Sequence, residues 1–172
     1  GAYRYEIGDS NLDSEASRNF DFAYSLNSTS ISLEASIFRN TINNFIHLSS
    51  TEVEIEGFSV YQFAASTAVL SGAEMSLSVS PKLIPGLSFN SALSYIVGNI
   101  EDDAIPFIPP TNLRTTISWK SESGLHASVS SLLVDRASSI EFSSPGYSVL
   151  DFTAGSVISE RLTWGVACSN IL

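Results

Sequence analysis

Segments of about ten residues in which apolar and small polar residues alternate recur along this chain. The stretch from Ile31 to Ile37 has an aliphatic or alanine residue at every second position, with hydroxyls or a carboxylate between them. Because successive side chains of a β-strand point to opposite faces, such a segment has one apolar face and one polar face. In water the apolar face is buried in a core, whereas in a bilayer it faces lipid and the polar face lines a lumen. The pattern predicts an all-β protein whose class depends on the solvent that the apolar face meets.

Composition excludes several classes of protein. Of the 172 residues, 44 % are hydrophobic and 15 % are charged, below the roughly 25 % charged residues of soluble domains. The net charge of -10 argues against nucleic acid as a partner. A single cysteine excludes an intrachain disulfide, and the lack of an apolar run of about 18 residues excludes a transmembrane helix. No signal-peptide pattern begins the chain, so we expect an exported protein to contain it as a mature piece or fragment.

The alternation and the turn-forming residues predict eight strands, at about residues 19–26, 30–47, 60–80, 87–97, 111–120, 124–136, 147–158 and 162–170. Short connections are expected at residues 27–29, 81–86, 121–124 and 159–161, and longer ones at 48–59, 98–110 and 137–146. Short and long connections therefore alternate strictly. A membrane barrel has tight periplasmic turns and longer outer loops, whereas a soluble sandwich has no reason to sort its connections this way.

The charges inside these strands are segregated by face. Five of them fall on the polar face: Asp21, Glu34, Glu74, Arg114 and Asp151. A basic residue on the lipid face at mid-bilayer would cost about 2–4 kcal/mol, which gives the segregation an energetic reason, although a half-buried soluble sheet shows the same pattern. Aromatic residues are expected near both interfaces of a barrel: Phe20 and Tyr95 at the outer ends of strands, Trp119 and Trp164 at the inner ends.

Six short motifs resemble those of TonB-dependent outer-membrane receptors, in the order and approximate spacing of that family. Residues 12–21 resemble the segment L-x-P-E-x-S-x-N-x-E that leads into a late barrel strand. Five further segments resemble later motifs of the family: 33–46 (A-x-F-Y-N-x-I-x-D-x-I), 72–75 (G-x-E, after an aromatic stretch at 61–63), 108–113 (I-P-P-x-R/N-L), 147–151 (Y-x-x-x-D) and 169–172 (x-N-L-F/L).

The resemblance implies an antiparallel transmembrane β-barrel of about 22 strands, of which this chain would supply eight consecutive strands near the end. Residues 1–172 would then be a partial barrel domain, without the plug domain and the last strand. The implied function is uptake of a scarce ligand, such as a ferric siderophore, haem, cobalamin or a glycan, across the bacterial outer membrane. The implied partners are outer-membrane lipid and lipopolysaccharide, and TonB acting through the plug region that this chain lacks. The resemblance implies no cofactor.

Two other classes remain open at the level of sequence. One is a self-contained eight-stranded outer-membrane barrel with a structural, adhesive or lipid-modifying role, whose first and last strands would pair with each other. The other is a soluble β-sandwich or ligand-binding barrel, whose apolar faces would pack against one another.

Candidate site residues are few. Glu101, Asp102 and Asp103 form an acidic run in a long loop that suits a cation or a ligand, or is a solvated loop; Phe107 and Ile108 follow it. His47 and His126 are expected at opposite ends of the strands, which argues against a shared metal site. No Gly-x-Ser-x-Gly elbow, phosphate-binding glycine loop or EF-hand pattern occurs. We therefore expect neither an enzyme nor a metal protein, and we expect Cys168 to face lipid.

Overall fold

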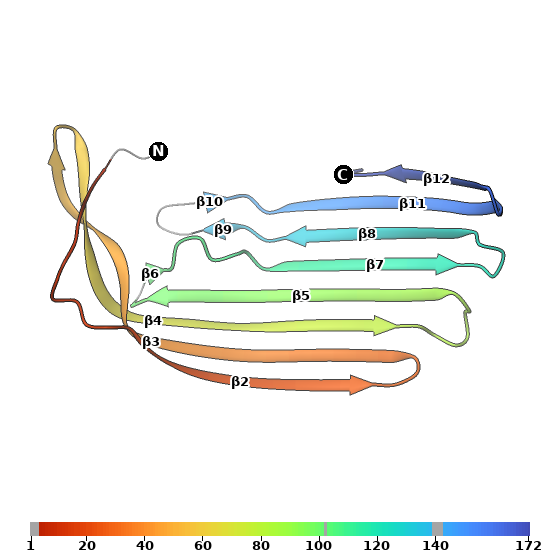
Figure 1. Cartoon of the computed structure of the whole chain (residues 1–172), viewed down its shortest axis with the longest axis horizontal. Coiled ribbons are helices and arrows are strands. Elements are labelled where there is room, and N and C mark those ends of the chain that lie inside the picture. The colour runs from red at the N-terminus through yellow and green to blue at the C-terminus, as the bar shows by residue number, and fades with distance from the viewer. Residues whose placement is uncertain (1–3, 102, 139–142) are drawn as a thin grey trace.

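A computed structural model of the chain describes residues 4–101, 103–138 and 143–172 (Figure 1). No helix in the described part of the chain is long and apolar enough to cross a membrane. The strands are β1 (Tyr5–Ile7), β2 (Ala16–Asn27), β3 (Ile31–Ile55), β4 (Phe58–Val79), β5 (Leu87–Ile100), β6 (Asp103–Ala104), β7 (Asn112–Lys120), β8 (His126–Val134), β9 (Ala137–Ser138), β10 (Ser143–Ser144), β11 (Tyr147–Ser159) and β12 (Leu162–Cys168).

The eight predicted strands are confirmed as β2, β3, β4, β5, β7, β8, β11 and β12. They form one antiparallel sheet in which each strand is hydrogen-bonded to the next along the chain. Figure 1 shows a single layer with β2 at one edge and β12 at the other. These two edge strands do not pair, so the described residues form an open sheet rather than the small closed barrel considered above.

The sheet has almost no buried core. Among the described residues only Val60 and Ala68 are buried apolar side chains. A soluble domain of this length would bury a large apolar surface between two layers. Large apolar residues are instead exposed along the strands, as in Phe20 at 65 % and Ile37 at 52 %. The soluble sandwich is therefore wrong, because the described residues form a single layer and these side chains have no second sheet to pack against.

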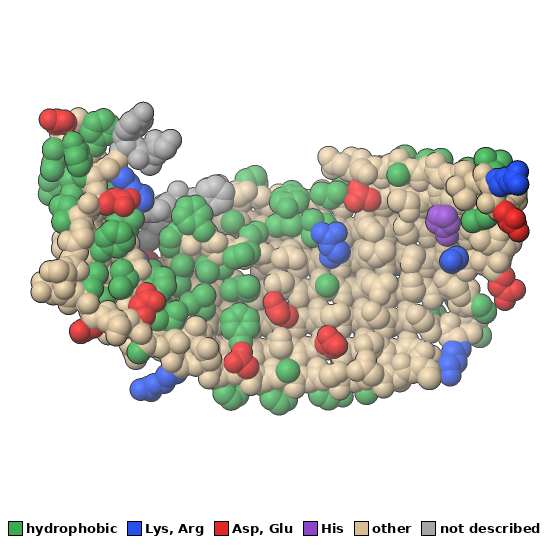
Figure 2. Space-filling view, viewed as in Figure 1, with side chains coloured by type: hydrophobic (Ala, Val, Ile, Leu, Met, Phe, Trp, Pro, Cys, Tyr) green, Lys and Arg blue, Asp and Glu red, His purple; other side chains and the backbone are tan. Residues whose placement is uncertain are grey.

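The hydrogen-bond register assigns every strand residue to one of two faces. Phe22, Ile37, Ala73 and Tyr95 lie opposite one another in a row across β2 to β5, and we call the face that carries them the outward face. The alternate residues form the inward face, which carries all five charges predicted for the polar face. Figure 2 shows the inward face, where acidic side chains lie in the middle of the strands and apolar side chains gather toward the long loops.

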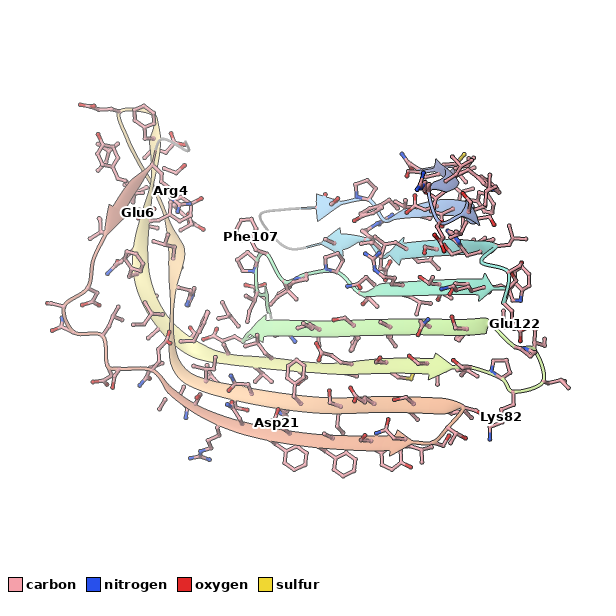
Figure 3. The ribbon with its side chains drawn as sticks, turned by 45° about the vertical axis from the view of Figure 1, so that its right-hand side comes forward. Arg4, Glu6, Asp21, Lys82, Phe107 and Glu122 are labelled. Carbon is pink, nitrogen blue, oxygen red and sulfur yellow. The ribbon has the colours of Figure 1, made fainter. Side chains whose placement is uncertain are left out.

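Short and long connections lie at opposite ends of the sheet, as the sequence predicts. Lys82 and Glu122 lie in short turns at one end, whereas Phe107 lies in a long loop at the other (Figure 3). Trp119 pairs with Leu87 beside the short turns, and Trp164 pairs with Ser156 at the same end. The positions expected for Trp119 and Trp164 are thus confirmed.

The predicted loop at residues 48–59 is wrong. Strands β3 and β4 remain paired up to Ile55 and Phe58, and Glu56 and Gly57 form the turn with φ values of 53° and 82°. Positive φ at both central residues is typical of a tight hairpin turn. Glutamates at every second position of this segment alternate with Val53 and Ile55, which is a strand pattern with one charged face. We call residues 48–63 the β3–β4 extension.

Strand β1 was not predicted and pairs in parallel with β4 in the extension, with Tyr5 opposite Val60 and Ile7 opposite Gln62. The rings of Tyr5 and Phe58 meet edge to face with centroids 6.3 Å apart. Arg4 forms an ion pair with Glu6 at 2.7 Å, and its guanidinium lies 5.1 Å from the ring centroid of Tyr61. Strand β1 and the β3–β4 extension together form a three-stranded projection beyond the long-loop end of the sheet (Figure 1).

The other two long connections also contain short ladders. In the connection predicted at 98–110, β5 continues to Ile100 and pairs with β6. In the connection predicted at 137–146, β9 pairs with β10. In each ladder, backbone N–H and C=O groups of the connection are hydrogen-bonded to each other.

Two asparagines from the resembling motifs have an unusual backbone conformation. Asn44 lies where the register of β3 and β4 shifts, and Asn170 lies two residues past the end of β12. Asn44 and Asn170 both have a φ of 55°, and asparagine tolerates this left-handed conformation better than most residues. Near Asn44, Glu15 Oε1 accepts a hydrogen bond of 2.8 Å from Ile46 N. At Asn170, Asp151 Oδ1 on the adjacent strand β11 accepts a hydrogen bond of 2.9 Å from Asn170 N. Each carboxylate thus satisfies a backbone N–H that lies outside the regular strand pairing.

Replacing Glu15 with alanine is expected to lower the free energy of unfolding by about 0.5–1.5 kcal/mol, because the N–H of Ile46 loses its protein acceptor. Urea unfolding of the protein measures the change. Asp13→Ala is the matched control, since Asp13 is an exposed carboxylate two residues away. Equal losses for both variants would contradict the role of Glu15.

Candidate ligand-binding vestibule

A cavity of about 490 Å³ lies at the long-loop end of the sheet, between the end of β5, the loop from 104 to 111 and the end of β8. Its apolar lining includes Ile96, Ile105, Phe107 and Ile108, and its polar lining includes Asp135 and Arg136. Ligand sites of proteins commonly have volumes of about 300–1,000 Å³ and combine apolar walls with a few polar groups. The cavity therefore has the size and chemistry of a small-molecule site, and we call it the vestibule.

The vestibule exists because the loop after β6 folds back onto the inward face of β5. Ile105 N donates a hydrogen bond of 2.9 Å to the carbonyl of Gly98. A Cβ atom at Gly98 would lie 2.9 Å from Ile105 Cδ1 and 3.2 Å from Ile108 Cδ1. The loop can approach the strand so closely because residue 98 has no side chain.

The opposite side of the vestibule is fixed by backbone contacts at the end of β8. Asp135 N donates to the carbonyl of Thr111 at 2.9 Å, which joins the two connections. The Asp135 carboxylate accepts a hydrogen bond of 2.7 Å from Arg136 N. Arg136 adds a cationic residue to the lining of a largely apolar cavity.

The candidate residues from the sequence lie in two different places. Phe107 lines the vestibule with 75 % of its side chain exposed and a φ of 63°, and Ile108 lines it as well. Glu101 directly follows β5 and Asp103 begins β6; both are exposed and neither lines the vestibule. Asp102 lies outside the described residues.

The two histidines lie at opposite ends of the sheet. His47 stacks on Phe45 at a centroid distance of 6.4 Å in the upper part of β3. His126 begins β8 beside the short turns, and a Cβ atom at Gly155 would lie 2.9 Å from its ring. Within the described ranges, no group of three or more His, Cys, Asp and Glu residues is arranged to hold a metal ion.

Sequence reasoning missed Asp135 and Arg136. The signal available was a charged pair at the end of the strand predicted at 124–136, next to a long connection. Charged residues at a strand end are common in any surface, so the pattern alone does not identify them. Their relation to Phe107 depends on the fold-back of a loop from another hairpin.

Beneath the vestibule the inward face is lined with hydroxyl groups. Ser88 and Ser118 on neighbouring strands are hydrogen-bonded at 2.7 Å, as are Ser128 and Thr153 at the same distance. Thr116 and Ser130 form a similar pair at 2.9 Å. A wettable inward face opposite a mostly apolar outward face is the arrangement of a lumen wall.

These features define the wall of a membrane β-barrel: one antiparallel layer, two faces of opposite polarity, and short and long connections at opposite ends. The family model described as "TonB dependent receptor-like, beta-barrel" matches residues 1–171. The chain therefore belongs to the TonB-dependent receptor β-barrel family.

Solved structures of similar fold are TonB-dependent receptors and transporters. The copper transporter OprC superposes with a TM-score of 0.77 at 19 % identity, covering 97 % of this chain and 28 % of its own. The siderophore receptor PirA from Pseudomonas aeruginosa gives 0.68 at 23 %, covering 98 % and 28 %. The ferric yersiniabactin uptake receptor FyuA from Yersinia pestis gives 0.67 at 18 %, covering 91 % and 25 %. Comparison with curated protein sequences gives no match.

The chain spans just over a quarter of the length of these structures. At sequence identities below 25 %, these similarities show a shared fold and do not identify the ligand of this chain.

Proposed function

We propose that this chain forms part of the barrel wall and outer vestibule of a TonB-dependent receptor in the bacterial outer membrane, which takes up a scarce ligand such as a ferric siderophore. The observation that carries the proposal is the vestibule at the long-loop end, with an apolar and aromatic lining and one arginine. Siderophore receptors among the structures of similar fold support it.

We infer that the described residues supply only part of the transport machinery. They provide a polar inward wall, an apolar outward wall and the vestibule, and we infer no catalytic set and no enzymatic activity. Residues 1–172 act as a partial barrel domain, and the rest of the barrel and a plug come from parts of the protein beyond these residues. Energy from the inner membrane, delivered through TonB to the plug, opens the path past this wall. Lipopolysaccharide and other outer-membrane lipids surround the outward face.

The chemistry of the vestibule favours an organic iron chelate over a bare copper ion. Among the described residues that line it there is no histidine, methionine or cysteine, the side chains that copper prefers. Apolar walls and a guanidinium suit a ligand with aromatic or aliphatic parts and a negative or polar group. Haem, cobalamin and glycans share some of these properties, so the uptake experiment below includes them as alternative ligands.

Uptake by living cells tests the proposal. Cells that produce the full-length protein, and matched cells without TonB, are given radiolabelled ferric catecholate, hydroxamate and phenolate siderophores, with haem, cobalamin, oligosaccharide and copper as separate arms. We expect TonB-dependent uptake in at least one siderophore arm. Loss of the gene without any change in siderophore uptake would refute the proposal, and exclusive uptake in another arm would reassign the ligand.

Phe107→Ser is expected to raise the half-saturating ligand concentration about tenfold, because a ring that contacts the ligand contributes on the order of 1.4 kcal/mol of burial. The amount of receptor in the membrane stays unchanged. Val53→Ser is the matched control, since Val53 is an exposed apolar residue on the β3–β4 extension, outside the vestibule. Identical uptake curves for the two variants would remove the vestibule as the ligand site.

A further inference from the structure

The outward face carries charge at two positions only. On the paired rows from the short turns up to Thr41, the charged outward residues of the eight long strands are Arg18 on β2 and Arg39 on β3. Both side chains are exposed. Every other outward position in these rows is apolar or a small neutral polar residue, so this basic pair is a local departure from the pattern of the whole face.

The two arginines are diagonal neighbours. Arg18 lies opposite Thr41, and Arg39 lies opposite Phe20, on adjacent strands. Diagonal pairs of an antiparallel sheet are about 7–8 Å apart, within reach of long side chains. Two guanidinium groups at this spacing can therefore contact one anionic group together.

No acidic side chain neutralises the pair. Across the register Arg18 is followed by Thr41 and Val69, and Arg39 is flanked by Phe20 and Ser71. The ion pair recorded among the described residues joins Arg4 and Glu6, far from this site. Asp21, three residues from Arg18 along β2, lies on the inward face. Glu15, three residues from Arg18 in the other direction, accepts a hydrogen bond from Ile46 N. Two unpaired like charges side by side repel one another and favour a bound anion.

The height of the pair above the short turns places it just below the top of a barrel's apolar band. Arg18 is eight positions from Leu26, and Arg39 is eight positions from Ile31, at the lower ends of their strands. At a rise of about 3.3 Å per residue and a tilt of about 40°, eight residues climb about 20 Å. The apolar band of a barrel is about 25 Å tall. The backbone of the pair thus lies about 5 Å below the top of this band, and the long arginine side chains extend to the headgroup level. Arg39 lies beside the exposed ring of Phe20, and Arg18 lies one row above it.

We propose that Arg18 and Arg39 form a binding site for the phosphate group of an outer-leaflet glycolipid. Guanidinium groups bind phosphate oxygens through paired hydrogen bonds, and arginine suits this geometry better than lysine. The occupant is a lipid because the site is continuous with the apolar rows below it, which contact acyl chains. This inference rests on the proposed outer-membrane location of the chain.

Lipid titration of the full-length protein in detergent, followed by native mass spectrometry, tests the site. The probes are bisphosphorylated lipid A, the same lipid after removal of both phosphates, and inorganic phosphate. For the double variant Arg18→Gln/Arg39→Gln we expect binding of phosphorylated lipid A to weaken at least tenfold, with binding of the dephosphorylated lipid unchanged. The variant Arg18→Lys/Arg39→Lys keeps part of the affinity. Arg114→Gln, on the inward face, leaves both affinities unchanged.

Equal binding of phosphorylated lipid A by the unaltered protein and the double glutamine variant would overturn the proposal. Binding of inorganic phosphate as tight as that of the lipid would overturn it as well, because the site would then recognise the free anion. Retention of the dephosphorylated lipid by the double variant shows that its outward face remains folded. Failure of the unaltered protein to bind either lipid would instead overturn the membrane location, and the site with it.

Discussion

Leu93→Arg is expected to destabilise the full-length protein in lipid vesicles by about 2–4 kcal/mol, or to prevent its insertion. Leu93 lies in the row between Met75 and Leu113, near the middle of the outward face. A guanidinium at this height would have to leave water for the acyl region. The described outward positions of the neighbouring strands contain no acidic residue to pair with it. Urea unfolding of the vesicle-inserted protein measures the loss.

Ser94→Arg is the matched control because it changes the adjacent residue of the same strand. Ser94 lies on the inward face, opposite Glu74 on one side and Asn112 on the other. The new charge there meets water and a carboxylate, so we expect a change within about 0.5 kcal/mol. Equal losses for Leu93→Arg and Ser94→Arg would mean that the two faces do not meet different solvents, which would contradict the barrel wall itself.

Gly86→Ala is expected to cost about 2–4 kcal/mol for two additive reasons. Gly86 has a φ of 79°, a conformation that costs an L-residue about 1–2 kcal/mol. A Cβ atom at this position would lie 1.8 Å from the backbone oxygen of Lys120, which a side-chain rotation cannot relieve. The substitution would also disturb the hydrogen bond of 3.0 Å from Lys120 N to the carbonyl of Gly86.

The effect of Gly86→Ala is measured by the same unfolding experiment, with Gly8→Ala as its control. A Cβ atom at Gly8 would have nothing within 4 Å, so this variant is expected to change stability by less than about 0.5 kcal/mol. A similar stability for both variants would show that the contact between β5 and β7 at the short-turn end is looser than its geometry indicates.

The strands and their faces were accessible from the sequence because the signal is local. Two neighbouring residues, Leu93 and Ser94, already differ in polarity, and this difference repeats along eight segments. Turn-forming residues such as Gly86 and Gly124 mark the short connections directly. The segregation of Asp21, Glu34 and Glu74 from the outward side chains follows from the same period of two.

The β3–β4 extension was missed because charge was taken as a mark of a loop. Glu52 and Glu54 belong to β3, in a part of the strand that projects beyond the long-loop end of the sheet and is exposed. Strand β1 has three residues, and its pairing with Val60 spans more than fifty residues of chain. Segments this short carry too little pattern to be assigned without their partners.

The candidate site was predicted in part. Phe107 and Ile108 stood out as apolar residues in a long loop, and both line the vestibule. Glu101 and Asp103 stood out by charge and lie in a neighbouring turn, away from it. Arg136 belongs to the vestibule only because the loop from Ile105 packs on Gly98 of a different strand.

The sequence by itself determined the secondary structure, the polarity of the two faces and the sorting of short and long connections, because each depends on the chemistry of residues close together in the chain. Only the tertiary structure decided that the sheet is a single open layer, that Arg18 and Arg39 lie side by side, and that Phe107 and Arg136 share a cavity. These outcomes depend on register and on loop packing between residues far apart in the chain. Such contacts depend on how several strands align together, which no single segment specifies.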